Sequence, residues 1–390
     1  MQKELLRLSA ANEGDLCSGF RLVKKEYVPS KHADLYTMRH EKTKAELLYF
    51  ARADENKTFA IAFKTLPEDD TGVFHILEHS VLNGSRRFPV REPFVNLLQS
   101  SMQTFLNAMT YPDKTVYPVS SRNGRDFHNL MEVYLDAVFC PAIYEKPQIF
   151  MQEGWHYEFD SEDAEPYYNG VVYSEMKGAF SDVSELMETE SMRLLFPDSS
   201  YGFVSGGHPE SIPKLTYEQF IANHKRYYHP SNARIFLDGK MDIDEILRYI
   251  DGEYLSKYDY RAPDFDFTVQ KQVVGEKTVS YSVKPGEEAK AHMVFSKLLC
   301  AHDEPEKVLA ANVLAKYLTG SNEAPLKRTF LEQALCQDIS LQVNDGIFQP
   351  YITLTIRNTE QEKFAQVEDC LRSSVQDILS GGLDREALLA

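Results

Sequence analysis

The sequence has few cysteines and no pairing pattern among them. Its 390 residues include five cysteines, an odd number, widely spaced and without a Cys-x-x-Cys pair. This pattern argues against a disulfide framework, and we expect reduced thiols in a cytosol-like compartment. The cysteines are Cys17, Cys140, Cys300, Cys336 and Cys370.

Long hydrophobic runs are also absent. No apolar stretch approaches the roughly 20 residues that a helix needs to cross a bilayer. Residues 1–9 contain no apolar run of signal-peptide length, and Glu4, Glu13 and Asp15 do not suit a transit peptide. We therefore expect a cytoplasmic protein with no membrane partner.

Basic residues are outnumbered. The 42 Lys and Arg against 59 Asp and Glu give a net charge of -17, which argues against nucleic acid as a partner. The acidity suits basic peptides, but it also suits an ordinary solvated surface. No Gly-x-Ser-x-Gly motif occurs, so nothing supports a serine nucleophile.

One short motif has the geometry of a catalytic metal site, namely His75-Ile-Leu-Glu78-His79. On a helix the two histidines lie one turn apart on one face, and Glu78 lies at its edge. Two imidazoles can bind one Zn²⁺, while a carboxylate off the metal acts as a general base toward water. The order inverts the commoner His-Glu-x-x-His. The alternative is an ordinary amphipathic helix, although chance would give this pattern only roughly 0.03 times in the chain.

A zinc site needs a third protein ligand and an open position for water. Spacing alone does not choose among the downstream glutamates. Asp182 is a further acid that either orients a ligand or lies on the surface. The candidate third ligands are Glu153, Glu175, Glu185, Glu188 and Glu190.

Periodicity predicts an α+β fold with helices packed on one face of an antiparallel sheet. Alternating runs over residues 20–66 predict an antiparallel meander, and residues 102–110 and 114–120 predict a hairpin. We expect the metal helix at 71–84, between a polar entry and Gly84. Further helices are expected at 94–98, 127–139, 171–195, 215–228 and 243–255, with a buried strand at 233–239.

The same order of elements begins again after an aperiodic linker. We expect a first domain at 1–256, a linker at 257–270 and a second domain of the same fold at 271–390. We expect this second copy to be non-catalytic, because Ala311, Leu314 and Ala315 replace the three motif residues, and incomplete, because it is much shorter than the first. Its expected strands are 277–284, 290–298, 338–344 and 349–357, and its expected helices are 305–318, 324–334 and 361–379.

Several blocks around the motif, in a fixed order, resemble the pitrilysin/insulinase family of zinc metallopeptidases, in its presequence-protease and falcilysin branch. They cover most of the first 240 residues. The blocks are His75-Ile-Leu-Glu-His79, Phe105-Leu-Asn-Ala-Met-Thr110, Thr115-Val-Tyr-Pro118, Gln152-Glu-Gly-Trp155, Gly170-Val-Val-Tyr-Ser-Glu-Met-Lys-Gly-Ala-Phe180, Val204-Ser-Gly-Gly207 and His229-Pro-Ser-Asn-Ala233.

The resemblance implies a zinc endopeptidase of short unstructured peptides. It assigns Glu175 as the third zinc ligand beside His75 and His79, with Glu78 as general base. It places substrate along Asn107 and Ala108 on a strand edge. It also gives Leu82, Phe94 and Leu98 as pocket-lining positions, for which plain core is the alternative.

The family resemblance further implies that this chain is the N-terminal part of a longer protein, whose C-terminal half is a partner that completes the active site. A second interpretation is a non-catalytic scaffold or processing-partner subunit of the same family. Such subunits usually lack part of the metal set. All four residues of that set are present here, which favours the enzyme.

Overall fold

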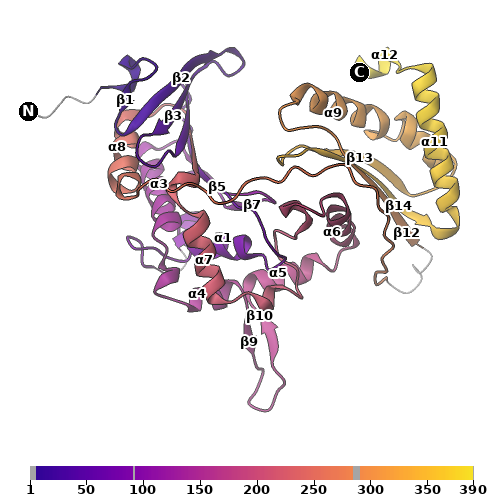
Figure 1. Ribbon diagram of the computed structural model, residues 1–390, viewed down its shortest axis with the longest axis horizontal. Coiled ribbons are helices and arrows are strands. Elements are labelled where there is room, and N and C mark those ends of the chain that lie inside the picture. Colours follow the sequence, from indigo (N-terminus) through magenta and orange to yellow (C-terminus); the bar gives the residue numbers. More distant parts are fainter. Residues whose placement is uncertain (1–5, 91–92, 284–289, 390) are drawn as a thin grey trace, which may run out of the picture. The chain divides into compact units, whose positions relative to one another are not determined.

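The computed structural model describes residues 6–90, 93–283 and 290–389 (Figure 1). The chain forms two compact units: unit 1 comprises Met1–Ala179 and Val204–Asp266, and unit 2 comprises Phe180–Phe203 and Phe267–Ala390. The break at 266/267 lies inside the expected linker, but residues 180–203 pack with unit 2 rather than with the first domain. Among the described helices, none is long and apolar enough to cross a membrane.

Unit 1 contains a nine-stranded sheet, in the order β1-β2-β3-β4-β11-β5-β8-β6, with β7 also paired to β8. The expected hairpin is present, because β7 and β8 pair around residues 111–113. The strands are β1 (Leu16–Cys17), β2 (Phe20–Val28), β3 (Ala33–His40), β4 (Glu46–Ala51), β5 (Lys57–Lys64), β6 (Gln103–Leu106), β7 (Met109–Thr110), β8 (Lys114–Ser121) and β11 (Ala233–Asp238).

The predicted meander over residues 20–66 is correct only as far as β4. β11 lies between β4 and β5, parallel to β4 and antiparallel to β5. Its apolar run, with Ala233, Ile235 and Leu237 buried, suits this central position. The connection over residues 52–56 therefore spans an inserted strand instead of a tight turn between neighbours.

Helices complete unit 1. α3 (Gly124–Phe139) packs on β5 and β8 through a buried face that includes Phe127, Leu130 and Tyr134. Asn123 caps its N-terminus, and Thr216 with Gln219 forms a capping box on α7. The α+β class is confirmed. The other helices are α1 (Val73–Val81), α2 (Pro93–Ser100), α4 (Gln148–Glu153), α5 (Val171–Ala179), α7 (Tyr217–Tyr227) and α8 (Ile243–Glu253).

The single helix predicted over residues 171–195 is wrong. It is two helices, α5 in unit 1 and α6 (Val183–Leu195) in unit 2. Asp182 starts α6, because its side chain accepts a hydrogen bond from the Ser184 backbone N–H at 2.8 Å. This acid therefore caps a helix and makes no ligand-orienting contact.

Unit 2 has a three-stranded antiparallel sheet in the order β12-β14-β13. Its core includes Leu326, Phe330, Ile339 and Ile356. The elements expected from residue 290 onward are present within a few residues. They are β12 (Lys290–Leu298), α9 (Pro305–Thr319), α10 (Pro325–Glu332), β13 (Asp338–Asn344), β14 (Tyr351–Glu360) and α11 (Phe364–Gly381), followed by α12 (Arg385–Leu389).

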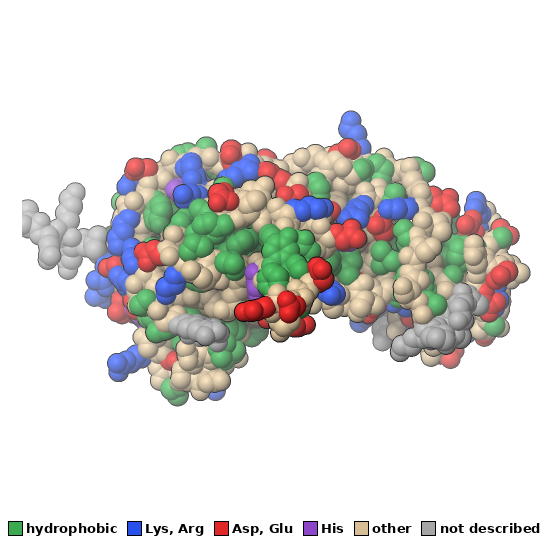
Figure 2. Space-filling view, turned by 90° about the horizontal axis from the view of Figure 1, so that it is seen from below, with side chains coloured by type: hydrophobic (Ala, Val, Ile, Leu, Met, Phe, Trp, Pro, Cys, Tyr) green, Lys and Arg blue, Asp and Glu red, His purple; other side chains and the backbone are tan. Residues whose placement is uncertain are grey.

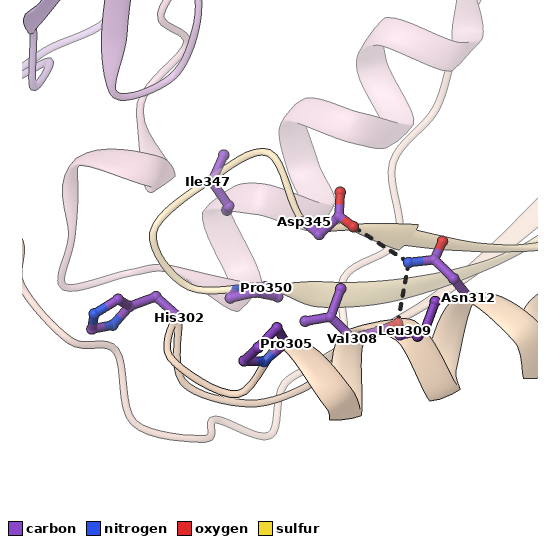
Figure 3. Close-up of a pocket in the computed structure, with 8 residues that line it drawn as sticks. All are labelled: His302, Pro305, Val308, Leu309, Asn312, Asp345, Ile347 and Pro350. Atoms are coloured by element: carbon purple, nitrogen blue, oxygen red, sulfur yellow. Dashed lines mark hydrogen bonds between the residues drawn. The ribbon is translucent and has the colours of Figure 1, made fainter. Parts of the chain in front are cut away.

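The strand expected at 277–284 does not form over 277–283, and residue 284 lies outside the described residues. Ala311, Leu314 and Ala315 lie on α9, where none can bind a metal. Beside this helix is an open hollow of about 340 Å³ (Figure 3). Asn312 donates there to Asp345 Oδ2 at 3.3 Å, and most of the lining is apolar. The hollow has no donor set resembling a catalytic centre.

Candidate metal centre

α1 carries both histidines of the motif. Its buried face is formed by Phe74, Ile76 and Leu77, which leaves His75 and His79 together on the less buried side. The helix begins after Gly72, a residue in the left-handed conformation with φ of 66°. The period of α1 thus fixes the two imidazoles one turn apart, with ring centroids 5.0 Å apart.

Glu175, on α5, faces both imidazoles. Its Oε2 lies 3.7 Å from His75 Nε2 and 3.8 Å from His79 Nε2. One donor atom from each residue lies within 4.8 Å of the other two, and no other group of this kind was found in the described residues. The structure therefore brings together the three residues that the motif and the resemblance assign to the metal.

The donor set suits zinc in a catalytic site. Two imidazole nitrogens and one carboxylate oxygen leave a fourth tetrahedral position open. Donors around tetrahedral zinc lie roughly 3.4 Å apart, given Zn–N and Zn–O distances of about 2.1 Å. The observed 3.7 and 3.8 Å are close to that separation. The exposed fraction of the side chains rises from 12% for His75 to 25% for His79 and 54% for Glu175, so one side is open.

A backbone carbonyl orients His75. Its Nδ1 donates to the Gly206 carbonyl oxygen at 3.0 Å, which leaves Nε2 available to a metal ion. The Gly206 loop is tied to the start of α1: Asp70 Oδ1 accepts from Val204 N at 2.8 Å, and Asp70 O accepts from His208 N at 2.8 Å. The Val204–Gly207 block belongs to the family resemblance, but the sequence does not reveal this role, because a carbonyl leaves no side-chain signature.

Glu153 orients His79. Its Oε2 lies 3.3 Å from His79 Nδ1, and its other oxygen accepts from Gln152 Nε2 at 2.9 Å. Burial lowers the pKa of His79, but the hydrogen bond to Glu153 and the charges of Glu78, Glu153 and Glu175 outweigh it and raise that pKa above its usual value. Glu153 was an open candidate for the third ligand. Its position at Nδ1, on the far side of the ring from Nε2, gives it the orienting role instead.

Glu78 is held beside this set by a residue that sequence analysis did not single out. Thr110, on β7, donates its hydroxyl to Glu78 Oε2 at 2.9 Å. Among the described residues, Glu78 forms no hydrogen bond or ion pair with either imidazole. Its carboxylate is therefore positioned next to the donors without being one of them. Thr110 ends the matched Phe105–Thr110 block, which was the available signal.

The other glutamates considered as ligands lie elsewhere. Glu185, Glu188 and Glu190 are on α6, and Glu190 pairs with Arg193 at 3.1 Å. They belong to unit 2, and none of them joins a three-residue metal group in the part of the chain that the structure describes.

The residues expected to contact substrate divide into two kinds. Asn107 and Ala108 join β6 to β7 at the end of the sheet, where β6 is the edge strand. Asn107 is held there, since its N–H donates to Pro118 O at 3.2 Å and its carbonyl accepts from Tyr134 Oη at 3.1 Å. On the apolar positions, Leu82 is buried at 8% exposure, as in a core, whereas Leu98 on α2 is 45% exposed and Phe94 is half-buried.

Two family descriptions match this chain. "Insulinase (Peptidase family M16)" matches residues 66–177, which include every residue of the metal group. "Peptidase M16 inactive domain" matches residues 214–390.

Related proteins match nearly the whole chain. Protein HypA of Clostridium perfringens is 43% identical over 97% of this chain and 39% of its own length. Presequence protease 1, chloroplastic/mitochondrial, of Arabidopsis thaliana is 37% identical over 95% of this chain and 35% of its own length. The mitochondrial presequence protease of Danio rerio is 34% identical over 97% of this chain and 38% of its own length. The chain thus spans less than two fifths of these relatives.

Solved structures share the fold at low sequence identity. A peptidase M16 inactive domain from Pseudomonas fluorescens has a TM-score of 0.69 at 14% identity, covering 90% of this chain and 81% of that one. Pitrilysin has a TM-score of 0.62 at 15% identity, and the match covers 95% of this chain and 39% of the pitrilysin chain.

Proposed function

Because this chain belongs to the pitrilysin/insulinase family of peptidases, in its presequence-protease branch, we propose that it carries the catalytic centre of a zinc-dependent endopeptidase. The proposed substrates are short unstructured peptides. One observation carries the proposal: Glu175 meets both imidazoles at 3.7 and 3.8 Å, and the Glu78 carboxylate is fixed beside them by Thr110.

The chain's own residues perform the acid–base work. His75, His79 and Glu175 would hold one zinc ion per chain, and that ion would supply Lewis acidity toward the peptide carbonyl and toward water. Glu78 takes a proton from the attacking water and passes it to the leaving nitrogen. Thr110 keeps the carboxylate in place for both transfers. Glu153 and the Gly206 carbonyl keep the imidazoles from rotating.

Substrate binding follows from the sheet edge. An extended peptide adds to β6 near Asn107 and Ala108, so its backbone is recognised by hydrogen bonds rather than by sequence. Leu98 and Phe94, both on α2, are the proposed apolar wall, whereas the buried Leu82 packs as a core residue. Only an unfolded segment can add a strand in this way, which restricts the substrates to unstructured peptides.

We place the protein in the cytoplasm and infer that the C-terminal half of the same protein is its partner. All five cysteines are free thiols, which supports a reducing compartment. The net charge of -17 disfavours nucleic acid and anionic membranes as partners.

The test is Glu78→Gln in the full-length protein, with exposed Glu218→Gln on α7 as the matched control. Glutamine keeps an oxygen that accepts from Thr110 but cannot take up a proton. Zinc content should stay at one per chain, while peptide hydrolysis falls by about 10²- to 10⁴-fold. Hydrolysis at the unsubstituted rate would refute the general-base assignment.

A non-catalytic scaffold is the alternative function. The complete donor set argues against it, and elemental analysis decides. About one zinc per chain, weakened by Glu175→Gln, supports the metal centre. A folded chain that binds no zinc would favour the scaffold.

A further inference from the structure

A small hairpin carries exposed aromatic side chains next to the metal centre in sequence. β9 (His156–Glu158) pairs antiparallel with β10 (Tyr167–Asn169), and the hairpin projects from the rest of unit 1 (Figure 1). Its exposed aromatic side chains each present between 40% and 57% of their surface to solvent. They are Tyr157, Phe159, Tyr167 and Tyr168.

The aromatic rings form a continuous run. Trp155 contacts Tyr157 and Tyr168 with ring centroids 5.7 Å apart in both pairs, and Tyr157 and Tyr168 lie 5.1 Å apart across the two strands. Tyr168 continues to Tyr173 at 5.8 Å. Tyr173 lies on α5, two residues before Glu175, so the run extends from the hairpin to the helix that supplies the third metal donor.

The base of this run is rigid. Trp155 Nε1 donates to the Leu215 carbonyl at 2.9 Å. Gly170, at φ of 148°, lies so close to Gly154 that an added Cβ would be 2.3 Å from the Gly154 carbonyl oxygen. The hairpin therefore leaves the body of unit 1 through a fixed, tightly packed joint.

The hairpin is also strongly acidic. Residues 156–170 contain five acids and no Lys or Arg. Figure 2 looks at this face from below and shows acidic side chains gathered beside hydrophobic ones over the hairpin. Two acids contact the hairpin itself: Asp160 accepts from Tyr167 Oη at 3.1 Å, and Glu158 accepts from Asn169 Nδ2. The acids are Glu158, Asp160, Glu162, Asp163 and Glu165.

This combination selects one kind of partner. An exposed apolar patch with a polar rim marks an interaction surface, and a two-stranded hairpin gains little stability from exposing its rings. Aromatic faces attract cations, and the surrounding carboxylates do the same. Nucleic acid and anionic lipid would be repelled by the five acids. The complementary partner is a peptide with apolar and basic side chains.

We propose that the β9–β10 hairpin is a docking surface for a cationic amphipathic segment of a peptide. This rests on the proposed function, since the docked segment belongs to a substrate that is cleaved at the metal centre. Apolar side chains of the segment cover Tyr157, Tyr168 and Phe159, and its Lys or Arg side chains reach Asp160, Glu162 and Asp163. The hairpin thereby favours basic peptides over neutral ones of equal length.

Trp155 provides a direct assay, because it is the only tryptophan of the chain and lies within the run. The metal-free chain, treated with a chelator so that no cleavage occurs, is titrated with an amphipathic peptide of Lys and Leu. The control peptide carries Glu in place of every Lys. The Lys peptide should shift Trp155 emission saturably and bind less tightly at higher salt. The Glu peptide should leave the emission unchanged.

Variants locate the surface, with affinities measured by calorimetry because the substitutions lie near the reporter. Neutralising Asp160, Glu162 and Asp163 together as Asn, Gln and Asn should weaken binding by roughly three- to thirtyfold. The matched control neutralises three acids of the β1–β3 region, as Glu13→Gln, Glu26→Gln and Glu41→Gln.

The aromatic part of the surface is tested separately. Tyr157→Ser with Phe159→Ser should weaken binding by about tenfold or more. Tyr260→Ser, at another exposed tyrosine of unit 1, should leave it unchanged. Equal zinc content in all variants shows that they retain the metal centre.

Equal binding of the Lys and Glu peptides, or hairpin variants that bind like their controls, would overturn the docking proposal. Neither result changes the interpretation of the Glu78→Gln experiment, because that experiment measures hydrolysis and not peptide binding. Conversely, a chain that binds the Lys peptide at the hairpin, in a full-length protein without hydrolytic activity, would support docking and reject the peptidase.

Discussion

Gly72→Ala is expected to damage the metal centre from outside it. A Cβ on Gly72 would lie 2.6 Å from the Gly206 carbonyl oxygen and 2.6 Å from Gly207 Cα, closer than the 3.0 Å that real Cβ contacts respect. Because these atoms are backbone, the whole Val204–His208 loop has to retreat. That loop carries the carbonyl that accepts from His75 Nδ1.

The size of the effect follows from the geometry. Relief of the overlap requires a retreat of at least about 0.4 Å, since overpacked backbone moves rather than compresses. A retreat of that size along the bond would lengthen the 3.0 Å His75 hydrogen bond to about 3.4 Å, past the limit of about 3.2 Å for a good N–H···O contact. Loss of such an orienting partner lowers metal affinity by about 10- to 100-fold, or roughly 1.4–2.7 kcal/mol.

The assay is competition for zinc between the chain and a chromophoric chelator. Visible absorption of the cobalt-substituted chain reports ligand geometry independently of activity. Gly239→Ala is the matched control: Gly239 has φ of 103°, and a Cβ there would lie 2.7 Å from the Asn56 carbonyl oxygen, away from the metal group. Both substitutions cost about 1–2 kcal/mol for an Ala at positive φ.

If Gly72→Ala and Gly239→Ala lose stability alike and both keep the original zinc affinity, the Gly206 carbonyl has no orienting role. Equal losses of affinity would instead show a general loosening of unit 1. Only a selective loss in Gly72→Ala, accompanied by a changed cobalt spectrum, agrees with the reasoning.

Three further measurements test the site and the cores. Glu153→Gln removes the charge at His79 Nδ1 and should weaken zinc binding by about tenfold or more in the same competition assay; unchanged affinity would contradict the orienting role. Burial, opposed by the hydrogen bond to the Val138 carbonyl, lowers the pKa of His224 from 6.5 to about 4. Between these two pH values His224 is protonated in the unfolded chain but neutral in the folded chain. Stability should therefore fall as the pH drops from 6.5, and urea unfolding of His224→Gln should show a dependence shallower by up to about 1.4 kcal/mol per pH unit; parallel profiles would refute this. Phe330→Ala should destabilise unit 2 by about 3–5 kcal/mol in urea unfolding without changing zinc affinity, because Phe330 is fully buried in the core of that unit.

The sequence predicted the metal group because helical spacing and a matched block are local signals. The period of one helix was enough to predict that His75 and His79 lie together. The prediction of Glu175 required the matched block of sequence around it. The choice between Glu153 and Glu175 could not come from spacing, since a ligand and an orienting residue differ by which ring nitrogen they face. The single helix predicted over residues 171–195 missed the boundary between α5 and α6, although Asp182-Val-Ser-Glu185 is a cap-like sequence in which Asp182 starts α6.

The order of strands in the sheet could not be predicted from a local pattern, for a different reason. The alternation over residues 20–66 correctly predicts a run of strands, but alternation shows which side chains face inward, not which strand is the neighbour. β11 pairs with β4 and β5 through the backbone, which any extended segment can offer. The expected strand at 277–284 shows the converse, because β-favouring residues there have no strand partner within the described residues.

The insertion of β11 has a consequence for how this protein is made. β4 and β5 emerge early from the ribosome, yet the strand that joins them ends at Asp238, so residues 65–232 are synthesised before the sheet can close. α1 and α5, which carry the three candidate metal donors, lie inside that interval, as does α4 with Glu153. Pairings so distant in the chain form slowly. Until β11 arrives, β4 and β5 each lack the neighbour on one side, and an open strand edge of this kind is a template for pairing with other chains.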